Sequence, residues 1–194
     1  MEPLPSFKNY LNTVNEIFEM SKLDNLNFLV DRLNSHFHKN GRIFLAGNGG
    51  SAAIASHAAT DLNKLRHNNN SINAISLNEN ISSITAYSND DSYENYLVNI
   101  IQNFQIQKSD TLVVISSSGN SLNIINLVNF CKDFGVVTFG LVGFNGGKLD
   151  KIVDYSILLK SKDNYYGPVE DLHMMIFHYY AHIVKNDLDE LRVN

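Results

Sequence analysis

The chain has one cysteine, Cys131, no tryptophan and only three prolines among its 194 residues. A single cysteine cannot form a disulfide within the chain, which favours a reducing compartment. Cys131 lies in an apolar helical pattern, so a small buried side chain is favoured over a nucleophile. The start of the chain lacks the features of a signal peptide, and no segment approaches the roughly 18 apolar residues of a membrane span. We therefore expect a cytoplasmic protein without membrane association.

Positive charge is also scarce. The 15 lysines and arginines are outnumbered by 20 aspartates and glutamates, which leaves a formal net charge of -5. This balance argues against a nucleic-acid partner, since such proteins present a broad basic surface. An anionic ligand would have to be held locally, by backbone amides and hydroxyl groups. With 44% hydrophobic residues, the length favours one domain with a full core over two small ones.

Hydrophobic periodicity predicts an α/β fold. Amphipathic patterns predict two helices within residues 1–40, and an alternating α/β core follows over residues 41–186, so that 1–194 forms one domain. The predicted strands are 43–46, 74–77, 112–115, 136–142 and 156–159, and the predicted helices lie near 51–65, 93–104, 121–134 and 168–185. Short apolar strands alternating with longer helices indicate a doubly wound, mostly parallel five-stranded sheet with flanking helices. The asparagine-rich stretch 63–73 is typical of a flexible loop.

Ligands of such sheets bind at the carboxyl ends of the strands, which directs attention to the loop after the first strand. There the sequence GNGGS (47–51) leads into a helix, and its members Asn48, Gly49, Gly50 and Ser51 suit phosphate binding at a helix N-terminus. The same segment fits the GxGxxA pattern of dinucleotide-binding proteins. The acid that would bind the ribose should follow about 20 residues later. The first candidate is Glu79, which is too distant, so a nicotinamide-dependent enzyme is disfavoured.

A second loop of the same kind follows the strand at 112–115. Its sequence, SSSGNS, concentrates hydroxyl and amide donors at a strand-to-helix junction, where they can bind a phosphate without arginine. The candidate ligands are Ser116, Ser117, Ser118 and Ser121.

Around these two loops the sequence resembles SIS-domain phosphoheptose isomerases. The resemblance rests on AGNGGSAAIASHAATDL and ISSSGNSLNIINLV, and continues in ITAYSNDDSYENYL, GLVGFNGGKLDKIVDYSILL and VEDLHMMIFHYYAHIV, which together span roughly residues 40–186. It implies a SIS fold and a homotetramer with active sites at subunit interfaces. It implies an intramolecular aldose–ketose isomerisation of sedoheptulose 7-phosphate to D-glycero-D-heptose 7-phosphate through an enediol(ate), feeding lipopolysaccharide, capsule or another glycan. It also implies that the serines of both loops cradle the phosphate, and that Asn89 and Asp90 form a polar turn near the substrate.

Catalytic candidates lie on two of the predicted helices. His57 and Asp61 are four residues apart, which places them on one helix face. The last helix carries Glu170, Asp171, His173, His178 and His182. Spacing alone pairs Asp171 with His178, whereas the resemblance selects Glu170 and His178. It implies that His57, Asp61, Glu170 and His178 bind zinc or a similar divalent metal, a donor set that suits such an ion. It also implies that Asp61 and His178 are catalytic and that Glu170 contacts substrate.

Three positions depart from the family pattern. Asp61 stands where relatives carry a longer glutamate, Glu170 where they carry glutamine, and Gly167 where they carry an aspartate near the substrate. A displacement of about 1 Å can cost about a hundredfold in rate. We interpret these changes as a variant site whose substrate could be a different phosphosugar. The alternative is a non-catalytic SIS protein that binds phosphosugars as a scaffold or regulator.

Overall fold

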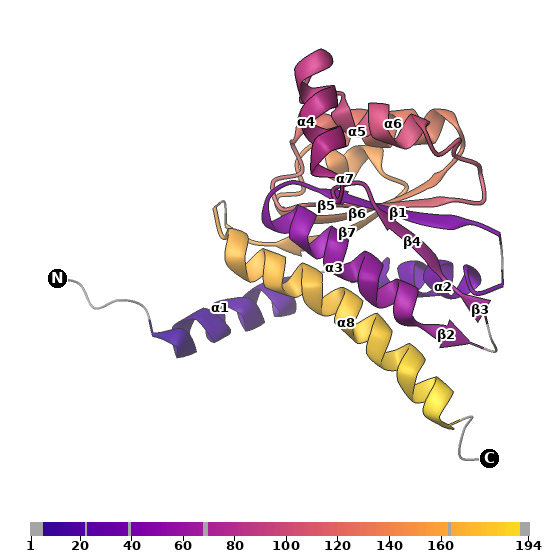
Figure 1. Cartoon of the computed structure of the whole chain (residues 1–194). Helices are drawn as coiled ribbons and strands as arrows, with labels where there is room; N and C mark the ends of the chain where they lie inside the picture. Colours follow the sequence, from indigo (N-terminus) through magenta and orange to yellow (C-terminus); the bar gives the residue numbers. More distant parts are fainter. Residues whose placement is uncertain (1–5, 22, 39, 68–69, 163, 191–194) are drawn as a thin grey trace.

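The computed structural model describes residues 6–21, 23–38, 40–67, 70–162 and 164–190. Within these ranges five strands form one sheet in the order β4-β1-β5-β6-β7, and every neighbouring pair is parallel (Figure 1). The predicted doubly wound parallel sheet is therefore confirmed. The strands are β1 (Arg42–Gly47), β4 (Asn73–Ser76), β5 (Thr111–Ser116), β6 (Val137–Phe144) and β7 (Tyr155–Lys160).

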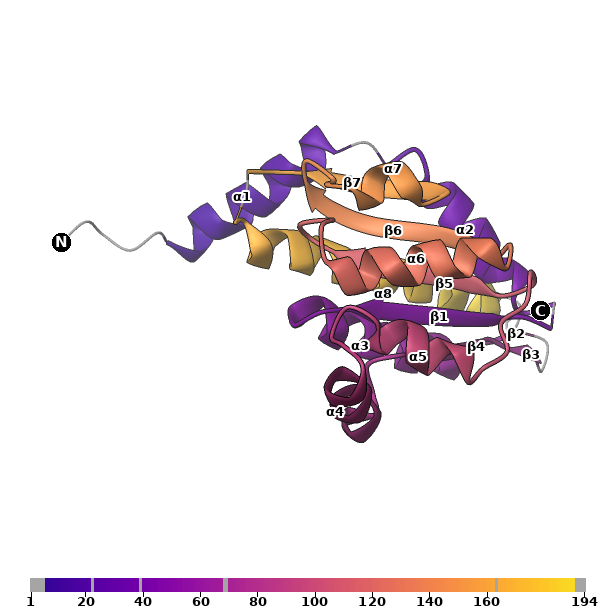
Figure 2. The same cartoon turned by 90° about the horizontal axis from the view of Figure 1, so that it is seen from above.

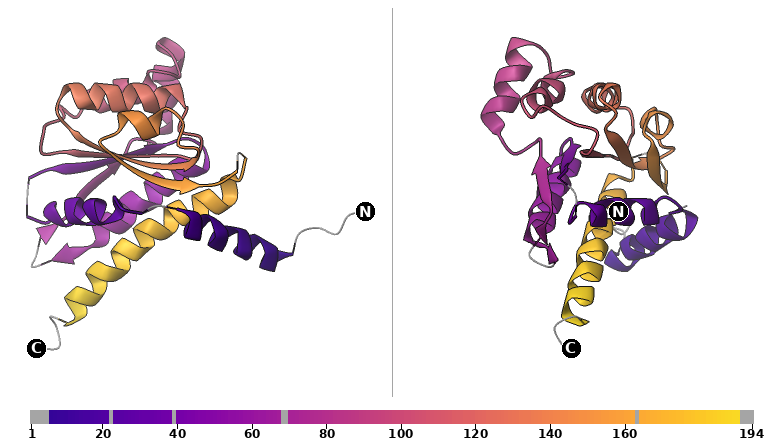
Figure 3. Two further views of the ribbon diagram at one scale, coloured as in Figure 1. Left: turned by 180° about the vertical axis from the view of Figure 1, so that it is seen from behind. Right: turned by 90° about the vertical axis from the view of Figure 1, so that its right-hand side faces the viewer.

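Helices cover both faces of the sheet. One face carries α2 (Leu26–Ser35), α3 (Gly50–Lys64) and α8 (Tyr166–Glu190), and the other carries α5 (Tyr96–Gln102), α6 (Leu122–Asp133) and α7 (Leu149–Ile152) (Figures 1 and 2). The first helix, α1 (Phe7–Met20), packs on β7 and α8. In contrast, α4 (Ile81–Asp90) stands away from the sheet and buries none of its residues (Figure 3).

The central strands explain why the core forms on both faces at once. Every residue of β5 is buried. Side chains alternate between faces along a strand, so Val113 and Ile115 join the cluster under α3 and α8 while Leu112 and Val114 join the cluster under α5 and α6. A continuous apolar run is what a parallel strand covered on both faces requires.

Three local predictions need correction. The stretch 63–73 is not simply a loop, because α3 continues to Lys64 and the short strands β2 (Arg66–His67) and β3 (Asn70–Ser71) pair antiparallel. The helix predicted over 93–104 is shorter, and α4 and α7 were not predicted. The apolar pattern of α4 is weak because this helix buries none of its residues, and only the partly buried Ile84 and Tyr87 pack against the core. Residues 68–69 of the asparagine-rich stretch lie outside the described ranges.

Two further predictions, one about Cys131 and one about membrane-spanning segments, can also be compared with the structure. Cys131 is fully buried, and burial, followed by the charge of Asp110, raises the pKa of its thiol to about 12. A thiol that is buried and stays protonated at neutral pH is not a nucleophile, so Cys131 serves in packing. Within the described ranges, none of the helices combines the length and the apolar character that crossing a membrane needs.

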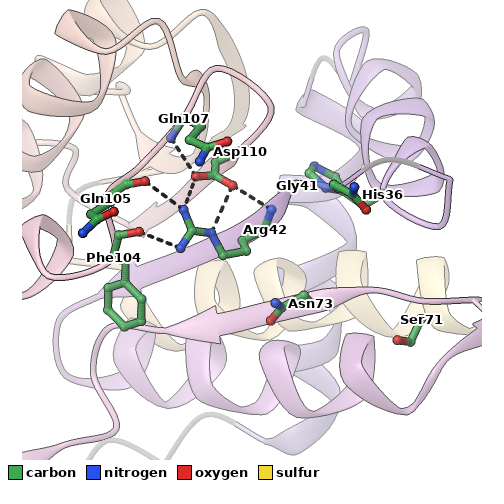
Figure 4. Close-up of a pocket in the computed structure, with 10 residues that line it drawn as sticks. His36, Gly41, Arg42, Ser71, Asn73, Phe104, Gln105, Gln107 and Asp110 are labelled. Carbon is green, nitrogen blue, oxygen red and sulfur yellow. Dashed lines mark hydrogen bonds and ion pairs between the residues drawn. The ribbon is translucent and has the colours of Figure 1, made fainter.

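A cavity of about 580 Å³ opens at the amino ends of the strands, at the edge opposite the phosphate loops (Figure 4). Its wall contains a nearly buried ion pair in which Arg42 Nη2 lies 2.7 Å from Asp110 Oδ2. Arg42 Nε also donates to Asp110 Oδ1 at 3.2 Å, while Nη1 donates to the carbonyl of Phe104 and Nη2 to that of Gln105. Burial alone would raise the pKa of Asp110, but hydrogen bonds from Arg42 and Gln107 outweigh it and hold that pKa below its ordinary value. This network fastens the loop before β5 to β1.

We expect Asp110→Ala to lower the free energy of unfolding by about 3 kcal/mol, because it leaves the Arg42 guanidinium half-buried and unpaired. The Lys64→Ala control removes an exposed partner of Asp61 at 3.9 Å and should cost less than about 0.5 kcal/mol. Urea unfolding at several pH values measures both. The folded-state pKa of Asp110 is lowered, so its contribution is complete above the unfolded pKa of about 4 and is lost as the pH falls through the folded one. Equal losses of unfolding free energy in the two variants would contradict the stabilising role of the Arg42–Asp110 ion pair.

Candidate active site

The two predicted phosphate loops lie side by side at the carboxyl edge of the sheet. Their strands are neighbours, with Gly47 of β1 opposite Ile115 of β5. The loops are also joined by a reciprocal amide pair, in which Asn48 Nδ2 donates to Asn123 Oδ1 at 2.9 Å and Asn123 Nδ2 donates to Asn48 Oδ1 at 2.8 Å. Asn48 thus acts as a bridge between the loops.

The first loop leaves open space at the beginning of α3. Gly49 caps the helix with a φ of +55°, and a side chain added to it would meet nothing within 4 Å. The first amides of a helix have no partner within the helix, and its N-terminus carries a partial positive charge. Ser51 is buried in the first turn. These features suit an anion at this position.

The second loop supplies hydroxyl groups next to that space. Ser116 and Ser117 are buried, and Ser117 Oγ has no hydrogen-bond partner among the described residues. Ser118 Oγ accepts from the amide of Asn120, while Ser121 occupies the N-cap of α6 without a capping bond from its side chain. A buried hydroxyl without a protein partner is costly, and a bound phosphate oxygen would satisfy it.

Three of the four predicted metal ligands come together between α3 and α8. His57 Nε2 lies 3.1 Å from Asp61 Oδ2 and 3.4 Å from His178 Nε2, and His178 Nε2 lies 4.0 Å from Asp61 Oδ2. One ligand atom from each residue lies within 4.8 Å of the others. Both histidine side chains are about half exposed and Asp61 is partly exposed, so a ligand can reach all three.

Glu170, the fourth predicted ligand, is not a member of this three-residue cluster. It lies near the other end of α3, where a side chain added to Gly50 would overlap the carboxylate of Glu170. Burial raises the pKa of Glu170, and the charge of Asp171 raises it further. Glu170 therefore lines the phosphate loop, whereas His178 lines the part of α3 two turns further on.

The remaining acidic and histidine candidates of α8 point elsewhere. His173 is fully buried, and burial lowers its pKa to about 4, so the ring is neutral at pH 7. His182 is exposed and its Nε2 lies 2.9 Å from Asn186 Nδ2. Asp171, which spacing alone paired with His178, instead accepts a hydrogen bond from Tyr10. Of the three histidines, only His178 belongs to the cluster.

The predicted polar turn at Asn89 and Asp90 is the last turn of α4. Both residues are exposed, and Asn89 Nδ2 donates to Asp90 Oδ1 at 3.0 Å. The residue of this region that contacts the phosphate loop is Tyr93, whose hydroxyl donates to Asn48 Oδ1 at 3.0 Å.

Sequence reasoning missed three polar residues that support the loops. Asn78 holds Gly47 by two hydrogen bonds of 3.0 Å, and Asn123 and Tyr93 both contact Asn48. The one signal for Asn78 and Asn123 was position, since Asn78 closely follows β4 and Asn123 closely follows the second loop. In an asparagine-rich chain that signal is weak.

We expect Gly119→Ala to be more damaging than Gly49→Ala, although φ is similar at the two positions, +63° and +55°. Both substitutions place a side chain at a positive φ that L residues rarely adopt, which costs about 1–3 kcal/mol at either position. At Gly119 the added methyl would also overlap the carbonyl oxygen of Gly146, and this overpacking adds about 1–3 kcal/mol to the expected loss. Thermal unfolding of both variants measures the difference. Similar melting temperatures would show that the loop around Gly146 moves to accommodate the added methyl group at little energetic cost.

Comparisons with known proteins show which family and which fold the chain shares. Residues 6–143 match the SIS domain family. A phosphoheptose isomerase of Aliarcobacter butzleri is 35% identical over 77% of this chain and 79% of its own length, and phosphoheptose isomerase 2 of Campylobacter jejuni is 37% identical over 78% and 75%. The solved structure of a phosphoheptose isomerase from Neisseria gonorrhoeae has the same fold, with a TM-score of 0.80, 24% identity, and coverage of 93% of this chain and 95% of that one. The chain belongs to the SIS domain family and, within it, to the phosphoheptose isomerases.

Proposed function

We propose that the protein converts sedoheptulose 7-phosphate to D-glycero-D-heptose 7-phosphate through an enediol(ate). The observation that carries this proposal is the alignment of two groups of residues along α3. The phosphate loops lie at its beginning, and His57, Asp61 and His178 gather roughly 12 Å further along the helix, at about 1.5 Å per residue from Gly49 to His57. A sugar phosphorylated at its far end can occupy both places, with its reacting carbons at the cluster.

The reaction moves a proton between two adjacent carbons and adjusts the protons on their oxygens. Asp61 is the carboxylate of the cluster and would take the carbon-bound proton. His178, 4.0 Å from it, would exchange a proton with the neighbouring sugar oxygen. The loops hold the phosphate, and this remote binding orients the reacting carbons.

The cluster also fits a divalent metal. Two imidazole nitrogens and one carboxylate oxygen within 4.8 Å of one another suit zinc, with a position left for substrate. His57, Asp61 and His178 would hold the ion, and Glu170 would have to swing from Gly50 to complete the four-residue set. A bound zinc ion would stabilise negative charge on the sugar oxygens.

Substitutions at two positions set this site apart from the family pattern. Asp61 is short, yet His57 and His178 both approach its Oδ2, so the cluster forms around the shorter acid. Glu170 brings a negative charge to the phosphate loop and would oppose an anionic substrate there. We infer that these changes tune activity or the choice of phosphosugar.

The scaffold alternative is not favoured, because the relatives are named isomerases and the acid and both histidines of the cluster are present and assembled. We also propose a cytoplasmic location, which the phosphorylated substrate and the single buried cysteine support. We further propose that the product supplies heptose for lipopolysaccharide, capsule or another glycan, and loss of heptose from these polymers in a deletion strain would test it.

The activity is tested by following sedoheptulose 7-phosphate by NMR with purified, zinc-loaded protein. We expect an aldoheptose phosphate to accumulate. His178→Ala should lower kcat by about a hundredfold or more, because general acid–base residues typically contribute that much. The same variant should weaken zinc binding by at least about tenfold in a competition assay with a coloured chelator.

The matched control is His182→Ala, which removes an exposed histidine one turn further along α8. It should retain both activity and zinc affinity. If the wild type leaves sedoheptulose 7-phosphate and related ketose phosphates unchanged, the proposed function is wrong. If His178→Ala loses activity but keeps zinc affinity, the metal site is wrong and the acid–base role stands.

We also propose that the protein is a homo-oligomer, with a tetramer as the expected state. The support is an apolar groove of about 380 Å³ beside α8, whose rim includes the exposed side chains of Phe18, Met175 and Tyr179. Exposed apolar surface of this kind marks an association site in many proteins. His178 of the half-exposed cluster lies on the same helix, so we infer that a second copy could cover both.

Met175→Glu places a charge in this groove and should shift the protein to a smaller species in sedimentation equilibrium at micromolar concentration, because a buried unpaired charge weakens an interface. The control, Leu122→Glu, changes an equally exposed residue on the opposite layer and should keep the wild-type mass. A monomeric wild type would contradict the proposal, and a Met175→Glu variant of unchanged mass would place the interface elsewhere.

A further inference from the structure

The turn between α4 and α5 reaches the first phosphate loop through two tyrosines. Tyr93 lies in this turn and Tyr96 begins α5, and their ring centroids are 5.1 Å apart. The Tyr93 hydroxyl donates to Asn48 Oδ1 at 3.0 Å. The Tyr96 hydroxyl accepts from Asn78 Nδ2 at 3.2 Å, and Asn78 bonds to both the amide and the carbonyl of Gly47. Two consecutive residues of the loop are therefore held from one turn.

The turn is firmly anchored, although α4 before it buries none of its residues and stands away from the sheet (Figure 3). Tyr96 is buried in the core under α5 and α6. Asn126 of α6 donates to the carbonyl of Glu94 at 3.1 Å and to Asn95 Oδ1 at 3.2 Å. Tyr93 therefore extends from a fixed base, and its half-exposed side chain lies beside the loop.

The first phosphate loop needs such support because it is rich in glycine. Gly49 and Gly50 follow Asn48 and are both exposed, and Gly49 has a φ of +55°. Glycine loses more conformational freedom on ordering than any other residue. A loop that is ordered before its ligand arrives has less entropy to lose on binding. Fixing Asn48, the residue before these glycines, should therefore raise the affinity of the loop for phosphate.

The side chain of Asn48 is fixed from two directions. Its Oδ1 accepts from Asn123 Nδ2 at 2.8 Å as well as from the Tyr93 hydroxyl, and its Nδ2 donates to Asn123 Oδ1 at 2.9 Å. The amide pair with Asn123 remains when the Tyr93 hydroxyl is removed, so the two loops stay joined. Loss of that hydroxyl should therefore loosen the first loop without disrupting it.

We propose that Tyr93 is a positioning residue of the active site, which acts through Asn48 to order the first phosphate loop before the substrate binds. The proposal rests on the proposed function for its kinetic consequence, but not for its effect on phosphate binding. Asn48 lies at the phosphate end of α3, and His57 of the three-residue cluster lies roughly 12 Å further along, at about 1.5 Å per residue. Tyr93 should therefore affect substrate binding rather than proton transfer.

The kinetic test compares Tyr93→Phe with the wild type, both as the zinc-loaded full chain. Tyr93→Phe should raise KM for sedoheptulose 7-phosphate by about fivefold, because one hydrogen bond to Asn48 is lost, and should leave kcat within about twofold. A merely structural role gives a different result. A weakened fold would lower kcat with the fraction of folded protein and would leave KM unchanged.

A second readout needs no catalysis. Isothermal titration with inorganic phosphate should give a Kd about fivefold higher for Tyr93→Phe than for the wild type. The matched control is Tyr87→Phe, which removes a hydroxyl that accepts from Asn103 Nδ2 at 3.1 Å, away from both phosphate loops. Tyr87 belongs to α4, next to the same turn, and its variant should keep the wild-type Kd and KM.

The route through Asn48 is tested with Asn48→Ala and with the double variant that also carries Tyr93→Phe. Adding Tyr93→Phe to Asn48→Ala should change kcat/KM by less than about twofold, the non-additivity expected for residues in contact. If Tyr93→Phe still costs its full factor in that background, Tyr93 does not act through Asn48 and the proposal is overturned.

Activity and phosphate affinity decide two separate questions. If the wild type does not isomerise the sugar, but Tyr93→Phe weakens phosphate binding and Tyr87→Phe does not, the proposed function is wrong and the positioning role stands. If Tyr93→Phe keeps the wild-type affinity for phosphate, or if the wild type binds no phosphate, the positioning role is wrong whatever the activity.

Discussion

Close parallel packing of α3 against α8 is the constraint on which the site depends. The buried stripe of α3 consists largely of small residues, among them Ala55, Ala58 and Ala59, and it shares one core cluster with Phe177 and Tyr180 of α8. Small side chains on one helix allow large ones on the other to approach closely. Since the helices run in the same direction, the order of residues along α8 matches the order along α3. Glu170 therefore meets the loop at Gly50, and His178 meets His57 and Asp61.

The fold could be predicted because its signals are strong and mutually consistent. Each strand of the sheet is a short apolar run, and the buried β5 shows why such a run belongs in the middle of a parallel sheet. Both predicted phosphate loops lie where the strand-to-helix pattern placed them. The helical spacing of His57 and Asp61 also predicted their shared face. These inferences concern residues close in sequence, for which local geometry is nearly sufficient.

Contacts between distant segments were harder to predict. Spacing within α8 favoured Asp171 as the partner of His178, but Tyr10 engages Asp171, and a pattern confined to one helix contains no information about α1. The burial of His173 was equally hidden, because a histidine on an amphipathic helix is compatible with either face. Helix α4 escaped prediction for a related reason. It buries none of its residues and only Ile84 and Tyr87 pack against the core, so its apolar stripe is too narrow to recognise.

The amide pair between Asn48 and Asn123 has a consequence for how the sequence can diverge. Each side chain satisfies both the donor and the acceptor of the other, in a partly buried place between the two loops. Replacing either one alone leaves a polar group of the other partly buried without a hydrogen-bond partner. We therefore expect the two positions to change only together, so that substitutions at Asn48 in the first loop constrain those at Asn123 after the second.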